Sequence, residues 1–202
     1  MTAGDRAPTL GAMRWDALFL DLETQVAASE RLDLDAEIAE RTRIETAAME
    51  LSDRLRGSLG RLIVVQLASG LTFEGILSHA GSQALVLDEP GHQVLVPYFA
   101  AVRYLGLSRL AVAEPSRVRQ KLGLASALRG LARDRARLAV LTTGGSAGEP
   151  TLHGVIDRVG RDYFDLAVTG EGEERRAVNV RQLATIPITA LAAVRSVRTP
   201  GP

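Results

Sequence analysis

The sequence contains no cysteine, a single lysine and few aromatic side chains. The absence of cysteine excludes disulfides, thiol nucleophiles and cysteine-bound metals, and it fits a cytoplasmic protein. Aromatic residues make up 4% of the chain, which leaves few rings for stacking the bases of a single strand. No apolar run approaches the ~20 residues of a membrane span, and the N-terminus lacks a signal-peptide pattern. We therefore expect a cytoplasmic protein without a membrane partner.

Composition favours a folded protein whose charge is unevenly distributed. The 202 residues are 46% hydrophobic, enough for a packed core in one or two domains. The formal net charge is zero, yet residues 1–57 carry twelve acidic and seven basic side chains, and residues 115–137 carry one acidic and seven basic. These two segments could attract each other or bind separate partners.

Two segments of the chain, 61–105 and 137–188, resemble each other. The first contains short β-type runs at 62–67, 71–78, 83–88, 93–96 and 101–105, separated by turn signals rich in Gly. The second has a similar pattern with a larger first turn at 144–150. The matched pairs are Gly75 with Gly154, Gly81 with Gly160, Val94 with Val178, and Val102 with Ile186. Five short strands with bends at glycine predict a small, strongly bent β-barrel in each copy.

The N-terminal region predicts helices. Trp15, Leu18, Phe19 and Leu22 recur at helical spacing and form one apolar stripe, which continues to Val26. This stripe either packs on a barrel or within a helical hairpin, or it binds a protein partner. We expect a break near residues 31–33, where Asp33 would cap a second helix, and a left-handed C-cap at Gly57.

A basic helix is predicted between the two β segments. Pro115 suits its first turn, and apolar residues recur along one of its faces. The candidate nucleic-acid contacts on this helix are Arg117, Arg119, Lys121, Arg129, Arg133 and Arg135. They would neutralise phosphates without reading sequence. The alternatives are a solvated linker and a partner for the acidic N-terminal segment.

The first β segment resembles the Sm-like family in the motif V-Q-L-x-S-G-x-x-F-E-G at Val65–Gly75 and in the runs that follow it, Leu85–Leu87 and Val94–Val102. The resemblance implies a short helix, then a five-stranded bent barrel, and assembly into rings that bind RNA. An SH3-like or PRC-type barrel would produce a similar pattern.

The residues that read RNA in that family do not match. Where Sm proteins hold uridine with Asp and Asn, this chain has Ala80 and Ala84 in the first copy and Val159 and Tyr163 in the second. The Lys-His pair of the bacterial Sm-like RNA chaperone corresponds here to Pro97–Phe99 and Arg181–Leu183. The resemblance therefore implies the fold more strongly than the RNA pocket.

No pattern predicts catalysis. The sequence lacks a G-x-S-x-G elbow, a phosphate-binding loop and a dinucleotide fingerprint. The three histidines, His79, His92 and His153, show no metal-ligand spacing. We expect a protein that is not an enzyme and has no cofactor or metal.

The predicted fold class is α+β, an N-terminal helical segment followed by two small Sm-like or SH3-like β-barrels joined by a basic helix. The predicted domains are a helical region at 1–57, a first barrel at 58–110, a connecting helix at 111–135 and a second barrel at 136–198. The functional hypothesis is a non-catalytic binding or assembly protein that contacts RNA with weak sequence preference. It would form homo-oligomers or bind a protein through barrel edges or the N-terminal helix. The alternative is a protein–protein adaptor that has lost nucleic-acid binding.

Overall fold

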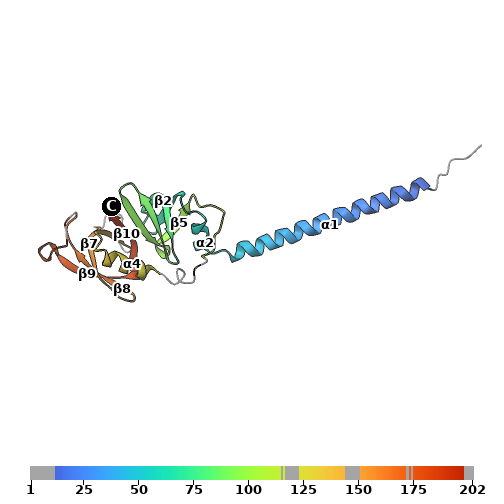
Figure 1. The fold of residues 1–202 in the computed structure, drawn as a ribbon. Coiled ribbons are helices and arrows are strands. Elements are labelled where there is room, and N and C mark those ends of the chain that lie inside the picture. Colours follow the sequence, from blue (N-terminus) through green and yellow to red (C-terminus); the bar gives the residue numbers. More distant parts are fainter. Residues whose placement is uncertain are drawn as a thin grey trace, which may run out of the picture. The chain divides into compact units, whose positions relative to one another are not determined.

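The computed structural model describes residues 12–114, 116, 123–143, 151–171, 173 and 175–197. The chain divides into two units, 1–49 and 50–202. The first unit contains α1 (Ala12–Ala48), and the second contains the sheet with its two covering helices (Figure 1). None of the described helices is long and apolar enough to span a bilayer.

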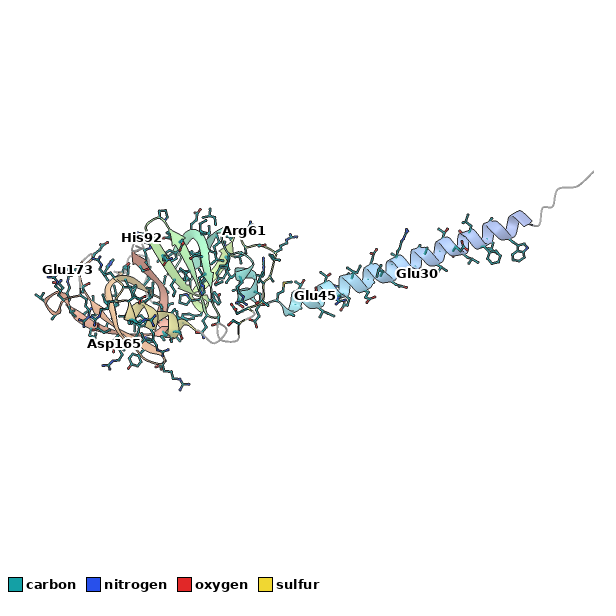
Figure 2. The ribbon with its side chains drawn as sticks, viewed as in Figure 1. Glu30, Glu45, Arg61, His92, Asp165 and Glu173 are labelled. Carbon is teal, nitrogen blue, oxygen red and sulfur yellow. The ribbon has the colours of Figure 1, made fainter. Side chains whose placement is uncertain are left out.

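Helix α1 is continuous, so the predicted break at residues 31–33 is wrong. Its 37 residues contain neither Gly nor Pro, the two residue types that most strongly interrupt a helix. Asp33 lies inside the helix and caps nothing. Ion pairs one turn apart, Arg41 with Glu45 and Arg43 with Glu40, support its C-terminal half. Figure 2 shows Glu30 and Glu45 on this helix.

The second unit begins with α2 (Leu51–Arg56), which precedes the first five strands. These are β1 (Leu62–Leu67), β2 (Thr72–Ala80), β3 (Ala84–Glu89), β4 (His92–Pro97) and β5 (Ala101–Leu105), with a 3-10 turn at Tyr98–Ala100. Buried and less buried residues alternate along β1 and along most of β2. The five predicted strands of the first copy are confirmed to within two residues.

The second half follows the same order. Helix α4 (Leu124–Arg133) precedes β6 (Leu138–Thr142), β7 (Leu152–Val159), β8 (Tyr163–Val168), β9 (Gln182–Pro187) and β10 (Leu191–Val197). Short 3-10 turns lie at Ala177–Asn179 and Ile188–Ala190. The second of these separates β9 from β10, as Tyr98–Ala100 separates β4 from β5.

The prediction of two separate barrels joined by a basic helix is wrong, because all ten strands form one open antiparallel sheet. The strand order is β5-β1-β2-β3-β4-β10-β6-β7-β8-β9, so each half repeats one arrangement. The halves meet where β4 pairs with β10. Figure 1 follows the sheet from the green strands of the first half to the orange and red strands of the second. One edge strand of each half is therefore paired with the other half within the chain.

Local geometry is similar at one position of each half. Gly75 lies opposite Ile63 of β1, and Gly154 lies opposite Leu138 of β6. A Cβ atom at Gly75 would lie 2.8 Å from the Asp88 carbonyl oxygen, and one at Gly154 would lie 2.2 Å from that of Ala167. Each glycine therefore lets the next strand of its half come close. Both halves also shift register just beyond this point, after Leu77 and after Ile156.

The last strands of the two halves correspond differently from the sequence match. Pro187 follows Pro97 by 90 residues, and each proline ends a strand that is followed by a 3-10 turn and a last strand. Ile186 therefore corresponds to Val96, and the predicted match of Val102 with Ile186 is wrong. The pattern shared by the two halves is an apolar residue followed by Pro, with Ala three residues after the Pro. Matching Val102 with Ile186 did not reveal this pattern.

Each half has its own core and covering helix. Leu55 of α2 is buried in the first cluster with β1 to β4, and Ala192 and Ala193 of β10 complete that cluster. Leu124 and Leu128 of α4 are buried in the second. The basic helix is thus not a connector between barrels. It is the covering helix of the second half, placed like α2 before its strands.

Gly57 ends α2 for a different reason than predicted. Its φ of −68° is right-handed, so the expected left-handed cap is wrong. A Cβ atom there would lie 2.1 Å from the Leu110 carbonyl oxygen. The glycine is needed because the segment after β5 returns across the end of the helix, where Val112 N–H donates to the Asp53 carbonyl at 2.9 Å.

Candidate functional site

The sheet has two outer strands, β5 and β9, and among the described strands each pairs on one side only. The Ile188 N–H donates to the Asp162 carbonyl at 2.8 Å, which fixes the hydrogen-bonding phase of β9 against β8. Because bonded and non-bonded pairs alternate in an antiparallel ladder, Ile186 and Ala184 bond inward. The backbone groups of Thr185 and Leu183 consequently face the free edge.

The internal junction shows what covers such an edge. By the 90-residue correspondence, β9 is the equivalent of β4 and β5 is the equivalent of β10. At the junction, Leu95 lies opposite Val194 and Gln93 lies opposite Ser196. Ala192 is 3% exposed there, whereas its equivalent on β5, Val102, is 64% exposed. The outer edges therefore expose positions that the inner junction buries.

An ion pair distinguishes the junction from the outer edges. Arg195 of β10 donates from Nη2 to Glu89 Oε2 at 2.9 Å, and its guanidinium lies 5.5 Å from the centre of the Phe73 ring. The equivalent positions on the outer edges are Leu105 and Asn179, which cannot form this ion pair. Leu105 is 54% exposed. At these two positions the outer edges are thus uncharged, unlike the junction that they resemble.

Two tyrosines, one just before the outer strand β5 and one on it, pack against the core of the first half. The Tyr98 hydroxyl donates to the Gly81 carbonyl at 2.7 Å, and burial raises its pKa well above the usual value. Tyr104 on β5 has a buried hydroxyl without a hydrogen-bond partner, and burial raises its pKa to about 12. Both side chains pack against the first core, so they fix the inner side of this edge.

Half of the predicted basic set lies on α4 and just after it. Arg129, Arg133 and Arg135 are exposed, whereas Arg117, Arg119 and Lys121 lie outside the described residues. Arg129 donates from Nη2 to the Gly160 carbonyl at 3.1 Å, and Arg133 lies 3.8 Å from Asp134. The structure thus brings α4 beside the turn between β7 and β8.

Two more exposed arginines lie nearby, Arg158 at the end of β7 and Arg161 in the turn that follows it. The carboxylate of Asp157, next to Arg158 in the sequence, pairs with Arg175 instead. Arg175 donates two hydrogen bonds to it, of 2.6 and 2.7 Å. These bonds lower the pKa of Asp157 below its usual value. The basic surface is defined here as Arg129, Arg133, Arg135, Arg158 and Arg161. It combines α4 and the residues just after it with the end of β7 and the following turn, which are separate in the sequence.

The predicted partner stripe lies on the N-terminal part of α1. Trp15, Leu18, Phe19 and Leu22 are all exposed, from 46% to 62%. The described part of the first unit contains no second helix, so a helical hairpin within residues 12–49 is wrong. The stripe stays a candidate surface for a protein partner.

The three histidines lie in different parts of the sheet. Among the described residues, no three His, Asp or Glu side chains are placed to hold a metal ion. His79 is exposed on β2, while His92 and His153 line one pocket at the junction of the halves. Sequence spacing missed this pair because β4 and β7 approach only through the pairing of β4, β10 and β6.

Comparison of the sequence with models of protein families and with curated proteins finds no match.

Proposed function

We propose that this protein is a non-catalytic binding and assembly protein that self-associates through its outer strands. One observation carries the proposal: the fourth strand of one half pairs with the fifth strand of the other, and the remaining fourth and fifth strands are open. The resemblance of Val65–Gly75 to the Sm-like family, whose members assemble edge to edge, supports the same role.

The expected contact repeats the inner junction between molecules. Strand β9 of one copy would pair antiparallel with β5 of the next, which places Thr185 opposite Tyr104 and Ala184 opposite Leu105. Both backbone rows would gain hydrogen bonds, and the exposed Val102 and Leu183 would lose contact with water. Because two different surfaces meet, the contact is heterologous and generates a closed ring or a filament.

Self-association predicts a molar mass above that of the single chain and a specific way to lose it. Replacing Leu183 with Pro removes an outward N–H without removing an inward bond to β8. Light scattering should therefore show a multiple of 21.6 kDa for the natural protein and a single chain for Leu183→Pro. The matched control, Leu183→Ala, loses the side chain but keeps the N–H, so we expect it to retain most of the assembly.

A natural protein that scatters as a single chain at every concentration contradicts the proposal. The adaptor alternative has its own signature, because a single open edge can accept a strand from another protein. In that case the chain stays monomeric, yet Leu183→Pro weakens capture of the partner and Leu183→Ala does not.

RNA contact through the basic surface is a second candidate function, favoured by its five exposed arginines. Labelled single-stranded RNA should bind at ~50 mM salt and dissociate as salt increases. Combining Arg129→Gln, Arg133→Gln and Arg135→Gln should flatten the slope of log affinity against log salt by about 2, because three phosphate contacts are lost.

The control for this experiment removes three arginines from the acidic helix α1 instead, through Arg31→Gln, Arg41→Gln and Arg43→Gln. Net charge changes equally in both triple variants, so only the location of the lost charge differs. Equal losses of affinity would attribute binding to overall charge and would contradict a role for the basic surface. The absence of binding at low salt would exclude RNA.

A further inference from the structure

An apolar patch lies on the outer face of the first half of the sheet, beside its free edge. Side chains alternate between the two faces of a strand, so Leu62 and Val64 of β1 face away from the first core. Ile76 lies directly opposite Leu62, and Leu105 lies directly opposite Val64. Leu62, Ile76 and Leu105 are 56%, 42% and 54% exposed. These four residues, named here the outer-face patch, connect the outer strand β5 to the two strands beside it.

The same face of the second half is covered at the inner junction. Counted from the bend glycines and from the 90-residue correspondence of the last strands, the equivalents of Leu62, Val64 and Leu105 are Arg137, Ala139 and Arg195. These three residues line a pocket together with Phe73 of the first half. The Phe73 ring lies 5.5 Å from the Arg195 guanidinium. A neighbouring half therefore covers, at the inner junction, the face that the first half leaves exposed at β5.

The open end of the second half carries the matching side chains. Leu152 follows Phe73 by 79 residues, the offset of the bend glycines, and it is only partly buried against the second core. Ala184 of β9 is likewise only partly buried there, whereas its equivalent at the inner junction, Val94, is fully buried. The second core is therefore less closed at β9 than the first core is at β4.

We propose that the outer-face patch binds Leu152 and Ala184 of a second copy of this chain. The inference rests on the proposed pairing of β9 with β5 and adds a side-chain contact to it. In that pairing Ala184 lies opposite Leu105, and Leu152 lies over Leu105 as Phe73 lies over Arg195. Apolar side chains of both copies then lose contact with water, which stabilises the pairing.

Charged residues border the patch and confine the contact to its Leu105 end. Glu74, opposite Val64, is exposed. Arg103 is exposed on the same face as Leu105, whereas its equivalent, Ala193, is fully buried. A long arginine side chain can cover apolar surface with its methylene groups and keep its guanidinium in water. The contact between copies is thus apolar at Leu105, where the inner junction has the charged Arg195.

A disulfide cross-link tests the contact directly, because the natural chain contains no cysteine. Leu105→Cys combined with Leu152→Cys in one chain should give covalent multimers after mild oxidation, measured by electrophoresis without reductant. The matched control is His79→Cys combined with Leu152→Cys, since His79 is exposed at the far end of β2. We expect the control pair to remain a single chain under the same oxidation.

A charge in the patch tests the energy of the contact. Leu105→Arg places a guanidinium against Leu152, which offers it no acceptor. The protein concentration at half-assembly, measured by light scattering, should rise by about tenfold or more. Leu34→Arg is the matched control, because Leu34 is 56% exposed on α1 and lies outside the sheet. It should leave this concentration unchanged.

The outcomes separate the contact from the strand pairing on which it rests. A natural protein that stays a single chain at every concentration overturns both. Assembly that Leu183→Pro abolishes, with no more cross-linking in the Leu105–Leu152 pair than in the control pair, overturns the contact alone. Natural assembly of Leu105→Arg likewise overturns the contact and leaves the strand pairing in place.

Discussion

Gly154→Ala is expected to lower the free energy of unfolding by about 3 kcal/mol, at the upper end of the usual cost of overpacking. The added Cβ would lie 2.2 Å from the Ala167 carbonyl oxygen. That oxygen belongs to backbone in β8, which is held by its pairing with β7 and β9, so it cannot move alone. Urea unfolding followed by circular dichroism measures the change.

Alanine substitutions at two other glycines provide comparisons for this prediction. At Gly75, the equivalent position, the Cβ would lie 2.8 Å from a carbonyl oxygen, so Gly75→Ala should cost less than Gly154→Ala. A Cβ atom added at Gly130 in α4 would meet nothing outside its own helical turn within 4 Å. Gly130→Ala should therefore stabilise the protein by about 0.5–1 kcal/mol through helix propensity. Equal effects at Gly154 and Gly130 would contradict the close approach of β7 and β8.

The second large effect is expected at Leu128, whose side chain is fully buried between α4 and the second core. Leu128→Ala should lower the free energy of unfolding by about 2–5 kcal/mol, because it removes buried methyl groups and leaves a cavity. Urea denaturation again measures the loss.

The control for this variant is Leu131→Ala, at a half-buried position in the same helix. It changes helix propensity equally and removes less buried surface, so it should cost clearly less. A solvated connecting helix would instead make both substitutions nearly neutral. The comparison therefore tests the placement of α4 over the second core directly.

The strands were predictable because their signal is local. The β-branched apolar run Leu62–Leu67 and the bend glycines Gly75 and Gly154 specify short bent strands without any distant information. The joining of β4 to β10 was not predictable in this way. It depends on which of several similar edges meet, and an edge pairing through backbone groups leaves little trace in side-chain pattern.

The candidate surfaces could likewise be predicted only where their signal is local. Exposure of Arg129 and Arg133 followed from helical spacing, since Leu124 and Leu128 occupy the opposite face. The contribution of Arg158 and Arg161 did not, because it requires α4 to lie beside the turn after β7. The pairing of His92 and His153 in one pocket likewise depends on the junction between halves.

The covalent link between the halves makes the inner junction independent of dilution. Two strands tethered in one chain meet at an effective concentration in the millimolar range or above, whereas strands on separate molecules meet at the concentration of the protein itself. In any larger assembly, each chain therefore contributes one strand junction, β4 with β10, that is already formed. If the assembly is a ring, it must contain an even number of halves. Junctions within a chain then alternate with junctions between chains, and only the latter depend on protein concentration.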